Sequence, residues 1–527
     1  MLSSVLVANR GEIARRIIRA CRSLGIRSVA VYSEADRAWP FVAEADEAVA
    51  IGPAPPRESY LDIERILDAA RRVRVEAIHP GYGFLSENWR FAQACAHAGF
   101  IFVGPSWQVI QQMGDKVGAR RLMAAAGVPV VPGSEGTVDT LEAARDAARR
   151  IGYPIILKAA AGGGGIGMVE VAGEAALAAA FASAQRRAQS AFGSGGLFIE
   201  RFLQAPRHVE VQVFGDAHGQ LVHLHERECS IQRRHQKLIE ESPAPNLPAT
   251  VKARLTEAAV AGGKAVGYVN AGTMEFVVAG NEFYFLEMNT RLQVEHPVTE
   301  EVTGLDLVQA QLRVAAGEPL PWKQDEIRRR GWSIECRIYA EDPARGFLPS
   351  PGRLARLALP AGPGIRLECG VAEGVEVSVH CDPLLAKLVA SGATREEAVA
   401  RMTVALDGFV VEGVKTVIPF LQRVVRSAAF RAGSVHTQMV EQGAFDGLRG
   451  QGPHHGGGLP DHGQGGRRGG RRRPCHRARV HEDGDPGGGA EGRHGQGDHG
   501  RRGADGAGGG HRRRPAIGGC RRRPRAT

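Results

Sequence analysis

The chain has 527 residues, of which 43% are hydrophobic, and a formal net charge of +10. One hydrophobic core does not grow to this size, so about two to four domains are expected. No apolar run reaches the ~18 residues of a membrane span, no signal peptide is recognisable, and the eight cysteines form no CxxC pair, so we expect free thiols and a cytoplasmic protein.

Strand-like and helix-like segments alternate over the first hundred residues. The expected elements are a strand at 4–10, a helix at 11–25, a strand at 26–33, a helix at 60–73 and a strand at 75–83. Strands separated by helices pair in parallel, so the chain should begin with a Rossmann-like parallel sheet. "ANRGEIARR" supplies only one glycine, so a dinucleotide-binding fingerprint is not supported.

A glycine loop between two strands marks the next part of the chain. "MGDKVGARRLMAAAGVPVVPG" (113–133) predicts a helix and then a strand, and 153–171 predicts strand, glycine loop and strand. The loop "AGGGGIG" (161–167) is not a Walker loop, because no Gly-Lys-Ser/Thr follows it. Its backbone N–H groups can approach phosphate oxygens, and Lys158 adds a positive charge beside it. We therefore favour a nucleotide lid over a simple mobile hairpin.

Two further segments fit a nucleotide. "GGLFIERFL" (195–203) offers Leu203 for an adenine ring and backbone groups for its edge. In "SIQRRHQKLIEE" (230–241), Gln232, His235 and Lys237 cluster, and a wet basic surface is the alternative interpretation. Cys229 could be a nucleophile, but a small buried filler residue is the better interpretation.

The most informative stretch is "EFYFLEMNTRLQVEHP" (282–297). It begins as a buried strand, and then every second residue is polar. An extended chain would place these polar residues on one face. A strand with one face in water is the usual explanation of such alternation. The face would carry Glu287, Asn289, Arg291, Gln293 and Glu295.

A neighbouring strand supports a different explanation. In "NAGTMEFVVAG" (270–280) the single acid Glu275 interrupts an apolar run, and Gly280-Asn281 is a turn signal. A hairpin would bring Glu275 beside Glu287. Carboxylates that converge on a sheet repel one another unless a cation lies between them, and oxygen ligands suit magnesium or manganese.

The remainder of the chain predicts antiparallel strands, one helix and a tail. Strands are expected within 332–342, 352–360 and 374–392, and a helix at 394–409. Residues 451–527 hold 17 Arg, no Lys and 7 Asp or Glu, which is the whole basic excess. This tail lacks core-forming residues, so it should be disordered. An RNA-binding segment would usually interleave aromatic residues, and this one has none.

At this point the chain resembles the biotin carboxylases of the ATP-grasp superfamily over residues 1 to about 447. The matching motifs appear in the family's order and include "ANRGEIA", "HPGYGFLSEN", "KAAAGGGG", "RRHQKLIEESPAP", "EMNTRLQVEHPVTE" and "DPLLAKL". "YVNAGTMEF" and "VEGVKTVIPFL" are more similar to the alpha chains of acyl-CoA carboxylases. The resemblance implies a biotin carboxylase N-terminal domain (1–115), an ATP-grasp domain (116–330) with a lid at about 131–203, a mixed α+β C-terminal domain (331–447) and a disordered tail (448–527).

The resemblance implies ATP-dependent carboxylation of biotin by bicarbonate through carboxyphosphate, the first half-reaction of an acyl-CoA carboxylase. The implied cofactors are ATP and Mg²⁺ or Mn²⁺, with carrier-bound biotin as substrate. The residues that match the family's nucleotide positions are Lys116, Lys158, Gly162, Gly163, Gly164, Gly165, Glu200, Arg201, Leu203, His208, Gln232 and His235. Those that match its other positions are Glu275, Glu287 and Asn289 for the metal, Arg291, Gln293, Val294 and Glu295 for bicarbonate, and Tyr82 and Arg337 for biotin.

The resemblance also implies four catalytic residues: Lys237, Arg291, Arg337 and the general base Glu295. Glu287 and Glu295 are eight residues apart, about 26 Å if fully extended. The strand must therefore bend or end after Asn289 if both serve one site. Two departures from the family pattern reduce the match: Ile166 stands where Arg or Lys is usual, and His380-Cys381 stand where aromatic residues are usual.

The expected partners are a biotin carboxyl carrier protein or domain, a carboxyltransferase subunit and a second copy of the chain, with no membrane and no nucleic acid. An out-of-frame tail is one interpretation, because "CHRARVHEDGDPG" (475–487) read one nucleotide later permits a Met-Lys-Met biotin-attachment signature. Two alternatives to biotin carboxylation stay open. They are a catalytically impaired homologue and another ATP-grasp ligase that joins a carboxylate to an amine.

Overall fold

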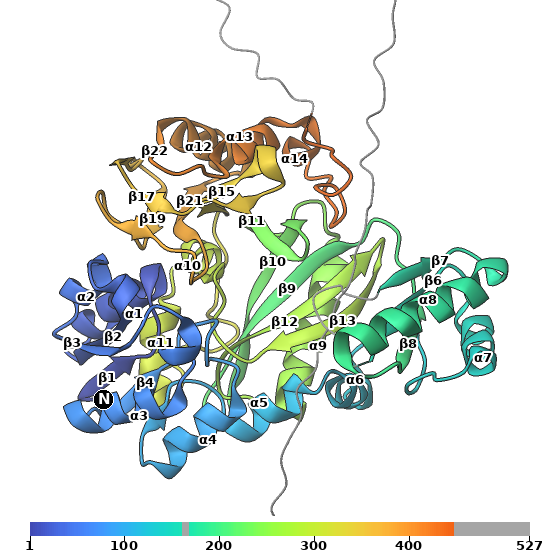
Figure 1. Ribbon diagram of the computed structural model, residues 1–527, viewed down its shortest axis with the longest axis horizontal. Coiled ribbons are helices and arrows are strands. Elements are labelled where there is room, and N and C mark those ends of the chain that lie inside the picture. The colour runs from blue at the N-terminus through green and yellow to red at the C-terminus, as the bar shows by residue number, and fades with distance from the viewer. Residues whose placement is uncertain (161–167, 447–527) are drawn as a thin grey trace, which may run out of the picture. The chain divides into compact units, whose positions relative to one another are not determined.

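A computed structural model describes residues 1–160 and 168–446 of the chain (Figure 1). The four glycines 162–165, the departure at Ile166 and the tail 447–527 lie outside the described residues. No helix within the described residues is long and apolar enough to cross a membrane. The six described cysteines are free, as the absence of CxxC pairs predicted.

The N-terminal region contains the expected parallel sheet. Its strands are β1 (Ser4–Val7), β2 (Arg27–Ser33), β3 (Glu47–Gly52), β4 (Ala77–His79) and β5 (Ile101–Phe102), in the order β3-β2-β1-β4-β5. All four pairings are parallel, which confirms the Rossmann-like interpretation. The connecting helices are α1 (Gly11–Ser23), α2 (Pro40–Glu44), α3 (Ile63–Val73) and α4 (Trp89–His97), with single 3₁₀ turns at Glu34–Asp36 and Pro56–Glu58.

Two helices lead from this sheet to a small three-stranded one. They are α5 (Trp107–Gly114) and α6 (Lys116–Ala125). Asp115 caps α6 by accepting a hydrogen bond from Val117 N, so Lys116 lies in the first helical turn. The strand expected near 128–133 is wrong, because only single bridges form there, at Val130 and Gly133. Pro129 and Pro132 cannot donate to a strand ladder, which explains the difference.

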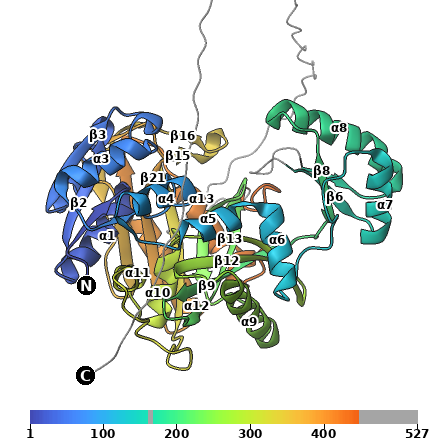
Figure 2. The same cartoon turned by 90° about the horizontal axis from the view of Figure 1, so that it is seen from below.

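The three-stranded sheet has the order β7-β6-β8. It comprises β6 (Ile155–Ala159), β7 (Val169–Val171) and β8 (Leu197–Arg201), and β6 pairs antiparallel with both neighbours. The strands before and after the glycine loop were predicted correctly. Helices α7 (Leu141–Ile151) and α8 (Glu174–Phe192) pack on this sheet (Figure 2).

An eight-stranded sheet, whose described pairings are antiparallel, carries most of the predicted site. Its order is β13-β12-β9-β10-β11-β14-β21-β19. The strands are β9 (Arg207–Gly215), β10 (Leu221–Arg233), β11 (Gln236–Ser242), β12 (Asn270–Ala279), β13 (Glu282–Asn289), β14 (Trp332–Tyr339), β19 (Ile365–Cys369) and β21 (Leu384–Gly392). Because β11 pairs with β14, one sheet includes residues from both sides of position 330, where a domain limit was expected. The domain limits therefore stay predictions.

Helices and short strands complete the described chain. The helices are α9 (Ala249–Ala265), which packs on β9 and β10, α10 (His296–Thr303), α11 (Leu307–Ala315), α12 (Arg395–Gly408), α13 (Ile418–Arg426) and α14 (Ala428–Arg431). The short strands are β15 (Glu341–Asp342), β16 (Leu348–Pro349), β17 (Gly352–Arg353), β18 (Arg356–Ala358), β20 (Glu376–Val377) and β22 (Val410–Glu412), with a 3₁₀ turn at Pro343–Arg345. The late helix at 394–409 was predicted correctly.

Candidate active site

The expected hairpin forms between β12 and β13. Glu275 and Glu287 are directly opposed in the antiparallel register, and Gly280 takes the positive φ of 62° that its turn requires. Opposed residues project from the same face of a sheet, so the two carboxylates are neighbours. Asn289 lies two residues further on β13 and donates through Nδ2 to Glu275 Oε1 at 2.8 Å.

These three residues fit a divalent cation. Their oxygen atoms are the ligand type that Mg²⁺ and Mn²⁺ prefer. The Glu287 side chain is 41% exposed, and the contact found for it is with the Lys116 ammonium at 3.5 Å. Its carboxylate is therefore accessible to an incoming ion. A cavity of about 200 Å³ is lined by Lys116, Glu287 and Asn289 among others.

The chain turns after Asn289, as the spacing argument required. β13 ends there, and α10 begins at His296 after a short turn. Glu87 holds this turn, because its carboxylate accepts from Thr290 N at 3.1 Å and from Arg291 Nε at 2.8 Å. The turn brings Glu295 back toward Glu275 instead of carrying it away along an extended strand.

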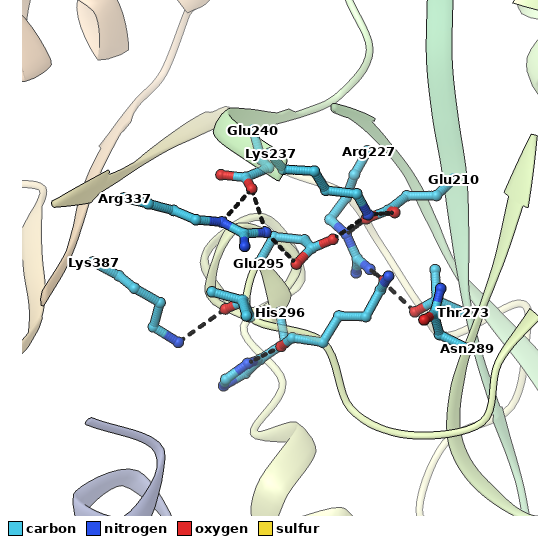
Figure 3. A network of polar contacts seen from close by, with 12 residues as sticks. Glu210, Arg227, Lys237, Glu240, Thr273, Asn289, Glu295, His296, Arg337 and Lys387 are labelled. Carbon is cyan, nitrogen blue, oxygen red and sulfur yellow. Dashed lines mark hydrogen bonds and ion pairs between the residues drawn. The ribbon is translucent and has the colours of Figure 1, made fainter. Parts of the chain in front are cut away.

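Lys237 joins three carboxylates at the centre of the site. Its Nζ lies 2.6 Å from Glu210 and 2.6 Å from Glu295 (Figure 3). The same atom lies 2.8 Å from Glu275. Burial alone would lower the pKa of Lys237, but the three carboxylates raise it well above its ordinary value, so the ammonium stays charged. Its position between Glu210 and Glu275 also means that these two acids need no metal ion to offset their repulsion.

Glu295 has a second cationic partner. Arg337, on β14, donates through Nη2 to Glu295 Oε2 at 2.9 Å and through Nε to Glu240 Oε1 at 2.6 Å. Burial would raise the pKa of Glu295, but Lys237 and then Arg337 lower it well below its ordinary range. The Glu295 carboxylate is therefore ionised at neutral pH. Figure 3 shows Lys237, Glu295 and Arg337 converging from different elements of the fold.

A fully buried arginine supports the same cluster. Arg227, on β10, donates through Nε to Glu210 Oε1 at 2.6 Å and through Nη2 to Gln293 Oε1 at 2.7 Å. It also reaches Thr273 and Gln212. Sequence reasoning missed Arg227, Glu210 and Glu240. The polar alternation of "HVEVQV" (208–213) was the available signal for Glu210, since it repeats the pattern that singled out 287–295.

Four of the expected nucleotide residues lie in two different parts of the fold. His208 contacts Glu275 Oε2 through Nε2 at 3.0 Å, and Gln232 is buried opposite Lys237 on β10 and β11, so both adjoin the central cluster. Lys158 and Glu200 form an ion pair on the three-stranded sheet, with Arg120 on the other side of Glu200.

Three expected nucleotide residues lie apart from these contacts. Arg201 and His235 are exposed, and Leu203 is partly buried. The described contacts therefore do not bring them to the central cluster.

Tyr82 and Val294 lie on loops beside the cluster. The Tyr82 carbonyl accepts from Asn9 Nδ2 at 2.8 Å, and its ring centroid lies 5.6 Å from Lys387 Nζ. The Val294 carbonyl accepts from the same lysine at 2.9 Å.

Cys229 is fully buried, and burial raises its pKa well above the ordinary thiol value, which favours the filler interpretation over a nucleophile.

A second cavity lies away from the predicted site residues. It measures about 500 Å³ and contains none of the predicted site residues. Charged side chains that pair with one another line it, including Arg16, Glu300, Asp306, Arg366 and Glu368. The chemistry expected from the sequence therefore belongs to the eight-stranded sheet and the turn after β13, and not to this 500 Å³ cavity.

Three family models cover most of the chain. Residues 1–110 match the biotin carboxylase N-terminal domain, residues 115–323 match the carbamoyl-phosphate synthase L chain ATP-binding domain, and residues 335–442 match the biotin carboxylase C-terminal domain. The first match covers the parallel sheet β1–β5. The second covers the hairpin β12–β13 and the turn after it, and the third covers β19, β21 and the helices that follow.

Relatives and solved structures agree with these matches. The chain is 52% identical to biotin carboxylase 2 of Bacillus subtilis (strain 168), over 84% of this chain and all of that protein. It is 51% identical to the mitochondrial methylcrotonoyl-CoA carboxylase subunit alpha of Rattus norvegicus, over 84% of this chain and 62% of that one. A crystal structure of the Hydrogenobacter thermophilus 2-oxoglutarate carboxylase biotin carboxylase domain dimer, with MgADP, ADP and bicarbonate, superposes with a TM-score of 0.79 at 48% identity, covering 84% of this chain and 98% of that one. The chain therefore belongs to the biotin carboxylase family.

Proposed function

We propose that this chain carboxylates biotin on a carrier, using ATP and bicarbonate. The observation that supports this best is the buried contact of Glu295 with both Lys237 and Arg337, next to the oxygen donors of the β12–β13 hairpin. Such a site combines a fixed base, fixed cations and a place for a metal-bound phosphate. This is the combination that bicarbonate activation by ATP requires.

Glu275, Glu287 and Asn289 would hold the metal ion. When bound, Mg²⁺ or Mn²⁺ neutralises phosphate charge and helps to align the terminal phosphate for attack. The nucleotide residues would be Lys116, Lys158, Glu200, Arg201, Leu203, His208, Gln232 and His235 together with the glycines 162–165, and Lys237 would contact the reacting phosphate. Lys116 and Lys158 are exposed enough to turn toward a nucleotide.

Bicarbonate would bind at Arg291, Gln293, Val294 and Glu295. A guanidinium binds a planar oxyanion through paired N–H bonds, and Arg291 and Arg337 can both act in this way. Glu295 is ionised but weakly basic while Lys237 and Arg337 surround it. A bound bicarbonate ion competes for this positive charge, which raises the basicity of Glu295 at the moment when it must accept the proton.

Biotin would bind beside Tyr82 and Arg337. Carboxyphosphate would break at the bond between its carbon and the bridging oxygen, which gives CO2 and phosphate. The phosphate would then take the proton from the ureido nitrogen, the Arg337 guanidinium would stabilise the enolate that develops on biotin, and the ureido nitrogen would form its new bond to the carbon of CO2. Arg337 is held by Glu240 as well as by Glu295, so its position is fixed before the negative charge appears.

The same proposal extends to the partners of the chain. We infer a biotin carrier protein or domain as the substrate and a carboxyltransferase subunit as the acceptor of the carboxyl group. A homodimer is the expected assembly, since the Hydrogenobacter thermophilus relative is a domain dimer. The chain itself needs to recognise biotin and not the acyl-CoA.

The test is release of phosphate from ATP by the purified full chain with Mg²⁺, bicarbonate and free biotin. Activity should require all of these, and Glu295→Gln should lower kcat by about 10²-fold or more, because it removes the general base. An amine-dependent but biotin-independent reaction would instead support an ATP-grasp carboxylate–amine ligase. ATP binding without any turnover would support a catalytically impaired homologue and contradict the proposal.

A further inference from the structure

Lys387 is fully buried on β21, and none of the roles above uses it. Its ammonium lies 3.1 Å from Glu12 Oε2 on α1 and donates to the Val294 carbonyl at 2.9 Å. Figure 3 shows Lys387 pointing at the backbone beside His296, where α10 begins. One side chain therefore links the strand β21, the N-terminal helix α1 and the turn that carries Glu295.

An ion pair with Glu12 alone explains this lysine poorly. Burying an ammonium group is costly unless good partners compensate for the lost water. Burial raises the pKa of Glu12 to about 7 even though Lys387 opposes the shift, so Glu12 is only partly ionised near neutral pH. Glu335 also faces Lys387, and burial raises its pKa well above the ordinary carboxyl value. The Val294 carbonyl is therefore a substantial part of what keeps the ammonium in place.

The Val294 carbonyl matters because of the peptide to which it belongs. A peptide unit is planar, so fixing the carbonyl oxygen of Val294 also fixes the N–H of Glu295. The preceding carbonyl, of Gln293, is held separately by His296 Nδ1 at 2.8 Å. Lys387 thus orients the last peptide before the proposed base, while other groups orient the rest of the turn.

We propose that Lys387 is a positioning residue for the bicarbonate site. Through Val294 it holds the peptide that leads into Glu295, and through Glu12 it ties that peptide to the N-terminal helix. The proposal rests on the proposed function, because it assigns the Val294–Glu295 peptide to bicarbonate binding. Lys387 itself touches no substrate in this arrangement.

Loss of the ammonium should affect bicarbonate more than ATP. Lys387→Met keeps an unbranched side chain that ends at the ε position, and it removes the ammonium group and its hydrogen bond. We expect kcat/KM for bicarbonate to fall by about tenfold or more, the loss that corresponds to one hydrogen bond to a charged group, while KM for ATP changes by less than about twofold. Lys387→Arg, which keeps a charged donor, should recover part of the loss.

A double variant separates positioning from stability. Lys387→Met leaves Glu12 without its partner, whereas Glu12→Gln with Lys387→Met removes both charges and should restore most of the lost thermal stability. The Val294 carbonyl still lacks its donor in the double variant. The bicarbonate defect should therefore persist after stability has recovered.

The control is a buried cation away from the turn. Arg395, on α12, pairs with Glu241 at 2.7 and 2.9 Å. Arg395→Met should lower the melting temperature and leave KM for bicarbonate unchanged. A folded double variant with wild-type bicarbonate kinetics would overturn the assignment of Lys387 alone. A wild-type chain without bicarbonate-dependent ATP hydrolysis would overturn the proposed function first, and this inference with it.

Discussion

The eight-stranded sheet and the three-stranded sheet hold their charged residues in opposite ways. On the large sheet, Arg227, Glu210 and Lys237 are buried, and each of them contacts at least two polar partners. On the small sheet, the Lys158 side chain is 33% exposed and that of Glu200 is 13% exposed, and the two form a single ion pair that Arg120 extends.

This difference in burial agrees with two different roles, the stabilisation of developing charge and the reversible binding of a nucleotide. A group that stabilises developing charge must be fixed before the reaction, since reorientation during the reaction would cost energy. A group that binds a nucleotide and then releases it needs a partner that it can exchange. Substitutions on the large sheet should therefore reduce both stability and catalysis, and those on the small sheet should affect nucleotide binding alone.

The strongest test of this contrast is Arg227→Met. The substitution removes a buried guanidinium and leaves Glu210 and Gln293 without donors that they now have. We expect the free energy of unfolding to fall by about 3–5 kcal/mol, the usual cost of breaking a buried ion pair. Urea denaturation followed by circular dichroism measures this loss. A change below about 1 kcal/mol would show that the cluster is not the rigid part of the molecule.

A companion variant checks the cause of that loss. Arg227→Met combined with Glu210→Gln removes the unpaired charge, so part of the stability should return. If the double variant is instead less stable by the sum of both single effects, the two residues act independently and the ion pair is not the reason.

Sequence reasoning succeeded where the signal was local. The Gly280-Asn281 turn, the lone acid of the first strand and the polar alternation that begins at Glu287 were enough to predict that Glu275 and Glu287 lie side by side, and the structure confirms it. The distance between Glu287 and Glu295 was enough to predict that the strand ends near Asn289. Each of these inferences used one turn or one segment, and no knowledge of distant pairing.

Sequence reasoning failed where pairing between distant strands decides the contact. Arg227 meets Glu210 because β9 and β10 pair in one register, and that register shifts between His223 and Glu226 at an irregularity where His225 has φ of 67°. A one-residue shift reverses which side chains share a face, and the sequence does not mark it. Lys387 was missed for the same reason, since its partners Glu12 and Val294 lie far away along the chain.

The pH dependence of stability tests whether a charged residue at the edge of the large sheet, Glu368, is also held by fixed partners. Burial would raise the pKa of Glu368 on β19, but Arg366 and Arg19 lower it to about 2 from an ordinary value of 4.5. Above pH 4.5 the carboxylate is ionised in both folded and unfolded chains, and its contribution to stability is complete. Between pH 4.5 and 2 the unfolded chain takes up the proton first, so the contribution disappears as the pH falls.

Glu368→Gln should therefore lower the free energy of unfolding by up to about 3 kcal/mol at pH 7. It should also flatten the fall in stability between pH 4.5 and 2. Urea denaturation at a series of pH values, with wild type and variant side by side, measures both effects. If stability falls with pH as steeply in the variant as in the wild type, Arg366 and Arg19 do not lower the pKa of Glu368 in the folded chain.

The smallest change in stability is expected for Lys158→Gln on the three-stranded sheet. Its ion pair with Glu200 is partly exposed, and such pairs contribute less than about 1 kcal/mol. If Lys158 contacts phosphate as proposed, KM for ATP should nevertheless rise by about tenfold, because a charge-assisted hydrogen bond to the substrate is lost. Arg149→Gln is the matched control, since Arg149 forms an exposed pair with Glu174 on the outer helices α7 and α8. If the two variants have the same KM for ATP, Lys158 does not contact the nucleotide. If Lys158→Gln loses several kcal/mol of stability, the charged residues of the small sheet are held as rigidly as those of the large sheet, and the contrast between the two sheets is wrong.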